Sequence, residues 1–171
     1  MDKGKRLLTT KDIAVIGLAV AIIEACKLVM QGLPNIEVTS FLVIMFTLML
    51  GWKMIFVVPV FTVIEGALFG FGIWWVMYIY AWPLLALVAW FICKNDSVLL
   101  YSIVSGLFGL CFGALCSIPY FFIGGWAMMF NWWIAGIPFD IIHGVSNFVI
   151  MLVLYKPVRK VIMSADKMNK N

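Results

Sequence analysis

Long apolar stretches, separated by short breaks that contain charged residues, glycine or proline, occupy most of this sequence. A helix that crosses a bilayer needs about 20 mostly apolar residues. The stretches cover residues 11–30, 36–51, 54–71, 74–93, 97–124 and 133–155. The second is short for a crossing, and Pro119 is expected to kink the fifth near its end. The alternation with a period of two that a membrane β-barrel requires is absent from the sequence.

The composition excludes a water-soluble domain. Hydrophobic residues make up 65% of the 171 residues, charged residues make up 12%, and the mean hydropathy is +1.10. Soluble domains carry about 25% charged residues, and a soluble chain of this length would bury only about 70% of its surface. We therefore predict an all-α integral membrane protein, in which residues 1–171 form a single compact bundle of six transmembrane helices.

The positive charges indicate the orientation of the helices. With the N-terminus in the cytoplasm, the six crossings place all but one of the twelve Lys and Arg residues on the cytoplasmic side, the exception being Lys27. Cytoplasmic loops carry an excess of Lys and Arg. We therefore expect both termini in the cytoplasm, as a basic segment 1–10 and a basic tail 156–171. Because Glu24 and Lys27 interrupt the first stretch, we expect it to remain as a membrane helix and not to be a cleaved signal peptide.

Four acidic residues fall in the outer third of the predicted bundle, namely Glu24, Glu37, Glu65 and Asp140. An ionisable side chain at membrane depth costs roughly 2.5–3.5 kcal/mol on insertion scales, so it normally faces a cavity or a partner. Glu24 and Lys27 either neutralise each other along the helix or project into the same outer cavity. Glu65 has no charged neighbour in its own helix, and we expect Lys27 or His143 to supply its counter-charge.

A polar stripe runs along the last predicted helix. Gly136, Asp140, His143 and Asn147 recur at intervals of four, three and four residues, which places them on one helical face. They form either the wall of a ligand pocket or a ladder of hydrogen bonds between helices. The convergence of three different polar side chains favours the pocket.

Tryptophan is concentrated on the outer side, and the pair Trp132–Trp133 lies just before the polar stripe. A membrane-interface belt would enrich tryptophan on both sides of the bilayer. We therefore expect this pair, and Trp133 in particular, to line or cover a ligand site.

Gly17, Ala21 and Ala25 form a stripe of small residues on the first helix, where another helix can approach closely. That helix belongs either to the same bundle or to a separate membrane protein. The sequence has no Walker A loop, no HExxH and no GxSxG motif, so it does not indicate ATP hydrolysis or these hydrolase chemistries. Asp140 and His143 are too few ligands for a metal site. We expect no cofactor, no metal and no nucleic-acid partner.

Several of these segments resemble the substrate-binding membrane subunit, or S component, of energy-coupling factor (ECF) vitamin transporters. The resemblance covers nearly the whole chain, with its basic N-terminus, six crossings and small-residue stripe. It includes residues 35–41 (Asn-Ile-Glu-Val-Thr-Ser-Phe), which lead into the second helix. Residues 78–85 (Tyr-Ile-Tyr-Ala-Trp-Pro-Leu-Leu) are similar to an aromatic-Ala-aromatic stretch in the family's fourth helix, and residues 136–143 with Asn147 are similar to its last helix.

The resemblance implies that the chain binds a vitamin or related micronutrient from outside and delivers it into a bacterial cell. It would do so in the plasma membrane with a transmembrane coupling subunit and two ATPase subunits. The ligand-binding role would fall on Glu65, Tyr78, Trp133, Asp140, His143 and Asn147. The contact with the coupling subunit would fall on Gly17, Ala21 and Ala25. The sequence lacks the full residue sets of the thiamine, riboflavin and biotin members, so the vitamin stays open.

Charge and aromatic content narrow the ligand class. Four outer acidic residues against one lysine favour a cation, and the surplus of tryptophan favours a heterocycle. We hypothesise that Asp140 and Glu65 hold the charge of such a ligand.

Two other function classes remain. A small polytopic enzyme would use Asp140 and His143 on a lipid-soluble substrate, but it needs a third convergent group within hydrogen-bond reach. A purely structural membrane subunit would leave the outer polar cluster unexplained. We therefore expect binding and transport without catalysis.

Overall fold

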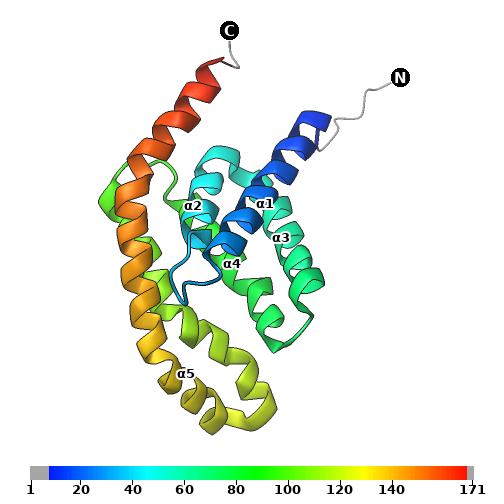
Figure 1. The fold of residues 1–171 in the computed structure, drawn as a ribbon, viewed down its shortest axis with the longest axis vertical. Coiled ribbons are helices and arrows are strands. Elements are labelled where there is room, and N and C mark those ends of the chain that lie inside the picture. The colour runs from blue at the N-terminus through cyan, green and yellow to red at the C-terminus, as the bar shows by residue number, and fades with distance from the viewer. Residues whose placement is uncertain (1–7, 169–171) are drawn as a thin grey trace.

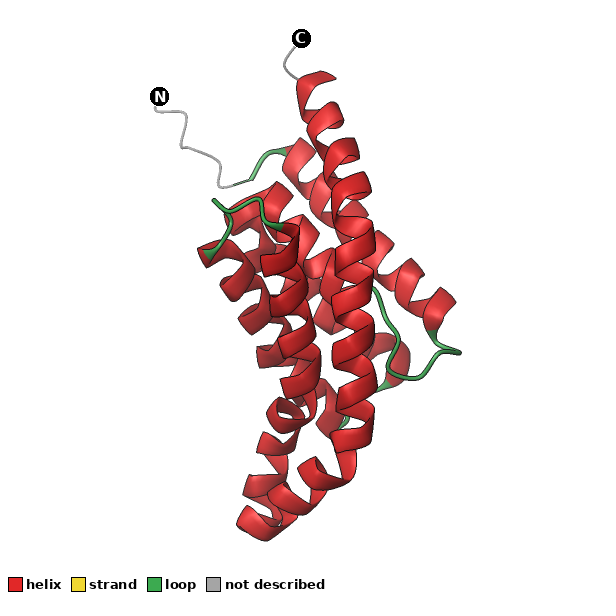
Figure 2. Ribbon diagram, turned by 90° about the vertical axis from the view of Figure 1, so that its left-hand side faces the viewer, coloured by secondary structure: helices red, strands yellow, loops and turns green. Residues whose placement is uncertain are grey.

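The computed structural model describes residues 8–168, and over that range it is helical with no strand, as the sequence predicts (Figures 1 and 2). The elements are α1 (Thr10–Met30), α2 (Thr39–Leu50), the short 3-10 helix η1 (Gly51–Lys53), α3 (Met54–Phe69), α4 (Ile73–Phe91) and α5 (Val98–Met168). Lys3, Lys5, Arg6 and Lys170, which contribute to the predicted charge asymmetry, lie outside the described residues.

Four helical segments of the described chain are long and apolar enough to cross a membrane, namely Thr10–Met30, Thr39–Phe69, Ile73–Phe91 and Val98–Ile162. Large apolar side chains point outward from them; Val29 is 86% exposed and Phe91 is 72% exposed. Soluble monomers rarely expose extended apolar surface of this kind. The structure therefore fits a membrane-embedded protein.

Two of these segments reverse direction within their length. Thr39–Phe69 turns at Gly51 and η1, which connect α2 to α3. In α5 the backbone leaves the helical region at Gly124 and Gly125, and Gly125 has a φ of 71°, which side-chain-bearing residues rarely adopt. The chain reverses at this glycine pair, where the predicted fifth crossing (residues 97–124) ends, because glycine adopts the positive φ without strain. Pro119, where the sequence predicts a kink, lies inside the helix. The two parts of α5, residues 98–123 and 126–168, are called its first and second arms.

The two arms of α5 run antiparallel and pack along most of their length (Figure 1). Small residues allow the close approach, since a Cβ placed on Gly109 would lie 2.8 Å from the Cα of Gly144. Contacts at successive levels join Tyr120 to Trp132, Gly113 to Asp140, and Tyr101 to Tyr155. The second arm is helical well beyond the predicted 133–155, because an apolar window marks a membrane crossing and not the ends of the helix that makes it.

The central helix of the bundle is α2. Every residue from Thr39 to Thr47 is buried, and the helix packs against α1, α4 and α5. A helix that is apolar around its whole circumference is normally buried on all sides. It begins later than the predicted residue 36, because residues 31–38 form a loop that crosses from the end of α1.

Helices α1 and α3 run parallel to each other beside this core. Lys53, at the start of α3, pairs with Asp12 in the first turn of α1, and Lys27, in the last turn of α1, pairs with Glu65 in α3. A capping box formed by Thr9 and Asp12 fixes the start of α1. These contacts bring the end of α1, the end of α3 and the start of α4 to one end of the bundle.

Candidate ligand-binding site

A cavity of about 340 Å³ lies between the end of α1, the loop 31–38, the end of α3 and the start of α4. Sites for small organic molecules have volumes of about 300–1,000 Å³. The charged side chains in its lining are Lys27, Glu37 and Glu65, and the aromatic ones are Phe69, Trp74 and Tyr78. The cavity therefore has the size and the mixed lining of a site for a small heterocyclic compound.

The most deeply buried charged group in this cavity is Glu65. Its side chain has 0% exposure, and its Oε2 accepts a hydrogen bond from Lys27 Nζ in an ion pair. Its Oε1 has no hydrogen-bond partner. A buried carboxylate oxygen without a partner is costly, so this atom is available to a ligand donor.

Glu24 lies beside Glu65 in the interior. Both of its carboxylate oxygens are buried without a hydrogen-bond partner, and the two carboxyl groups interact electrostatically. The sequence left two roles open for Glu24 and Lys27. In the structure Lys27 pairs with Glu65 of another helix and not with Glu24.

Two aromatic rings accompany the Lys27 ammonium. Its Nζ lies 5.1 Å from the ring centroid of Phe69 and 5.2 Å from that of Tyr78. Cations within about 6 Å of an aromatic face are attracted by the ring quadrupole. Glu65, Phe69 and Tyr78 thus form a cage around a positive charge, and this name is kept for them below.

Aromatic packing holds Tyr78 in place. Its ring makes edge contacts with Trp74 and Trp82, at centroid distances of 5.3 and 5.4 Å, and stacks on Phe61 at 6.1 Å. Three of these rings belong to α4 and recur at intervals of four residues, which places Trp74, Tyr78 and Trp82 on one face of that helix. Two of the three aromatic residues that line the cavity, Trp74 and Tyr78, therefore lie on this face of α4.

Glu37 closes the cavity from the loop 31–38. Its carboxylate accepts hydrogen bonds from Ser40 N at 3.0 Å and Ser40 Oγ at 2.6 Å, so it caps the start of α2. Its Oε1 also lies 3.1 Å from His143 Nε2. The contacts with Ser40 and His143 hold the Glu37 carboxylate between the start of α2 and the second arm of α5.

The second arm of α5 holds the loop against the bundle. Ser146 Oγ donates to the carbonyl oxygen of Asn35 at 3.0 Å, and Asn147 Nδ2 donates to Ser40 Oγ at 3.1 Å. With the His143–Glu37 contact, these bonds join the predicted polar stripe to the loop and to the start of α2. His143 and Asn147 therefore support the cavity wall from behind.

Asp140 faces the first arm of α5. Its Oδ1 accepts a hydrogen bond from the backbone N–H of Gly113 at 2.9 Å. The approach requires glycine, because a Cβ at position 113 would overlap the Asp140 carboxylate. Oδ2 is buried without a partner. Of the two roles predicted for the polar stripe, Asp140 therefore has the second, a hydrogen bond between helices, and it does not form a pocket wall.

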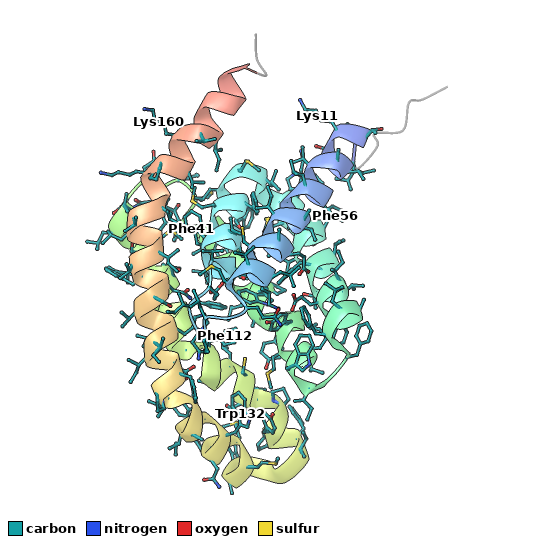
Figure 3. All side chains as sticks on the ribbon, viewed as in Figure 1. Lys11, Phe41, Phe56, Phe112, Trp132 and Lys160 are labelled. Carbon is teal, nitrogen blue, oxygen red and sulfur yellow. The ribbon has the colours of Figure 1, made fainter. Side chains whose placement is uncertain are left out.

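The structure thus separates the predicted site residues into two groups. Glu65 and Tyr78 line the cavity, whereas Trp133, Asp140, His143 and Asn147 do not. Trp133 lies near Phe130 on the second arm, with ring centroids 6.4 Å apart. Its neighbour Trp132 lies close to the reversal of α5. Phe112, whose ring contacts His143, lies further from that reversal (Figure 3).

Sequence reasoning missed Phe69 and Trp74 as lining residues. Phe69 follows Glu65 by four residues, so a helical reading of α3 places both on one face. Trp74 precedes Tyr78 by four residues on α4 in the same way. These spacings were a usable signal in the sequence.

The small-residue stripe of α1 faces outward. Gly17, Ala21 and Ala25 are all exposed, and no atom lies within 4 Å of the position of a Cβ on Gly17. Of the two predicted uses of this stripe, packing within the described bundle does not occur.

Among the side chains that the structure describes, residues 8–162, no three from His, Cys, Asp or Glu are grouped so that they could hold a metal ion. Comparisons of the chain with protein-family models, with curated proteins and with solved structures find no match.

Proposed function

We propose that this chain is a substrate-binding S component of an ECF-type transporter in a bacterial plasma membrane, and that it binds a cationic heterocyclic micronutrient. The single observation that carries the proposal is the cavity in which the fully buried Glu65 and the ring of Tyr78 converge. A carboxylate with an unpartnered oxygen beside aromatic rings is suited to a flat, positively charged compound.

The proposed topology has six crossings with both termini in the cytoplasm. Support comes from the alternating direction of α1, α2, α3, α4 and the two arms of α5. Lys11 and Lys160 lie at the same end of the molecule (Figure 3), and Lys53 joins Asp12 in the first turn of α1. An excess of basic residues at one end favours a cytoplasmic location for it, which would turn the cavity outward.

The short α2 fits this topology. Its 12 residues span only about 18 Å at the helical rise, less than the bilayer core of about 30 Å. Non-helical backbone is tolerated at membrane depth where it lines a water-filled cavity. The loop 31–38 lines the cavity and would complete the crossing.

The proposed partners are a transmembrane coupling subunit and two ATPase subunits. Support for the coupling contact is the outward-facing stripe of Gly17, Ala21 and Ala25 on α1. Small residues in an exposed row allow the backbone of a partner helix to approach closely.

The enzyme alternative has less support. It would use Asp140 and His143, but Asp140 Oδ1 is bonded to Gly113 N and His143 Nε2 contacts Glu37. Neither side chain lines the cavity. A structural subunit, in turn, would have no use for a cavity with a buried, half-partnered carboxylate.

Native mass spectrometry of the detergent-purified protein tests the proposal, with identification of any small molecule that it releases. We expect one heterocyclic compound per chain, and co-purification of the coupling and ATPase subunits from the native membrane. A bound lipid intermediate, or turnover of a lipid-soluble substrate by the isolated chain, would favour the enzyme instead.

A further inference from the structure

We propose that Lys27 occupies the cation subsite of this cavity as a built-in competitor, and that a monocationic ligand binds by taking the place of its ammonium group. The inference rests on the proposed function in one respect, that the cavity is the ligand site. It adds two points to that function. The ligand's charge lies in the cage of Glu65, Phe69 and Tyr78, and the ligand must displace the ammonium group of Lys27.

The geometry of the cage is that of a site for an organic cation. Two rings stand 5.1 and 5.2 Å from the Lys27 Nζ, and the Glu65 carboxylate pairs with it. Aromatic rings around a positive nitrogen, with a carboxylate beside them, are how proteins recognise ammonium ligands. All three cage residues line the 340 Å³ cavity, so a ligand placed there reaches each of them.

Lys27 pairs with only one of the carboxylate oxygens of this region. Glu24 and Glu65 supply two carboxyl groups against one ammonium, and Glu65 Oε1 and both oxygens of Glu24 are buried without a hydrogen-bond partner. A cation that presents more than one donor, or spreads its charge over a flat ring, satisfies these atoms better than a single ammonium.

Lys27 is also able to leave. Its side chain is 26% exposed, whereas that of Glu65 is fully buried. Lysine carries a strongly hydrated ammonium on a flexible four-carbon stem, so the group can move into the aqueous part of the cavity without a change in the backbone of α1. A tethered competitor has a high effective concentration. It therefore excludes weakly bound cations and selects those that interact better with the rings.

The test uses the full chain in detergent and N-methylpyridinium as the probe, with the neutral isostere toluene as the matched control. Binding is followed by quenching of tryptophan fluorescence, since Trp74 lines the cavity. We expect Lys27→Met to bind N-methylpyridinium at least tenfold more tightly than the unmodified chain. The gain should vanish in the double variant Lys27→Met/Glu65→Gln, and toluene should show no such gain. Equal affinity in the two proteins, or a gain that survives Glu65→Gln or extends to toluene, would overturn the proposal.

A second measurement needs no variant and covers the case in which Lys27→Met does not fold. The unmodified protein is acetylated with N-hydroxysuccinimide acetate, with and without saturating N-methylpyridinium, and the modified lysines are identified by peptide mass spectrometry. We expect the probe to raise the acetylation rate of Lys27 several-fold relative to Lys53, which pairs with Asp12 away from the cavity. An unchanged or lower rate at Lys27 counts against displacement.

These measurements are independent of the transporter assignment. Both use the isolated chain, so failure to co-purify the coupling and ATPase subunits would refute the S-component proposal and leave the cation subsite standing. If N-methylpyridinium does not bind but the coupling and ATPase subunits co-purify, the cation subsite is refuted and the S-component proposal stands.

Discussion

Lys27 and Glu65 lie 38 residues apart in the sequence and form an ion pair between α1 and α3 in which Glu65 is fully buried. The pair fixes the parallel arrangement of these two helices at the end of the bundle where the cavity opens. It also places a positive charge between the rings of Phe69 and Tyr78. The same contact thus serves the packing of the helices and the character of the site.

Substitution of Glu65 by glutamine should weaken binding of the co-purifying ligand at least tenfold, equivalent to about 1.4 kcal/mol. The physical reason is the loss of the only carboxylate in the cage. The measurement is isothermal titration in detergent. The matched control is Asp140→Asn, which keeps an oxygen to accept from Gly113 N and lies outside the cavity lining.

We expect the Asp140→Asn variant to change affinity by less than about threefold, or 0.7 kcal/mol. This differs from the sequence hypothesis, which gave Asp140 and Glu65 the same role. If Asp140→Asn weakens binding as much as Glu65→Gln does, the ligand charge lies nearer α5 than the structure indicates.

Gly113→Ala should destabilise the protein by about 1–3 kcal/mol, the usual cost of overpacking. The added methyl group would overlap the Asp140 carboxylate, and the two arms of α5 would have to separate. The midpoint of thermal unfolding in detergent, followed by circular dichroism, measures the effect. Gly17→Ala is the control, because its methyl group meets no atom within 4 Å. A loss of stability in Gly17→Ala equal to that in Gly113→Ala would contradict this explanation.

Tryptophan at Gly17 or Ala21 should abolish co-purification of the coupling subunit and leave ligand affinity unchanged. A large side chain in the exposed stripe keeps a partner helix from close approach. Pull-down from membranes and titration of the isolated variant give the two readings. Ile103→Trp is the control, since Ile103 is 43% exposed on α5, away from the stripe. If the control variant loses the coupling subunit equally, the stripe is not the contact.

The sequence located the helices well and the partners of polar groups only in part. The starts of α1, α3 and α4 agree with the apolar stretches to within a residue, because apolar run length is a local property. For Glu65 the sequence offered Lys27 or His143 as counter-charge, and the structure has Lys27. His143 instead contacts Glu37, 106 residues away. No local pattern fixes a pairing over such a separation.

The sequence by itself determined that this is an all-helical, membrane-compatible chain, since apolar content and helical spacing follow from consecutive residues. Only the tertiary structure decided which polar groups share a cavity. That choice depends on how each helix is rotated about its axis and how closely its neighbours approach, as the contacts of Gly109 with Gly144 and of Gly113 with Asp140 illustrate. Packing between residues that are far apart in the chain therefore orients Asp140 toward the backbone of the first arm of α5 and Glu65 toward the cavity.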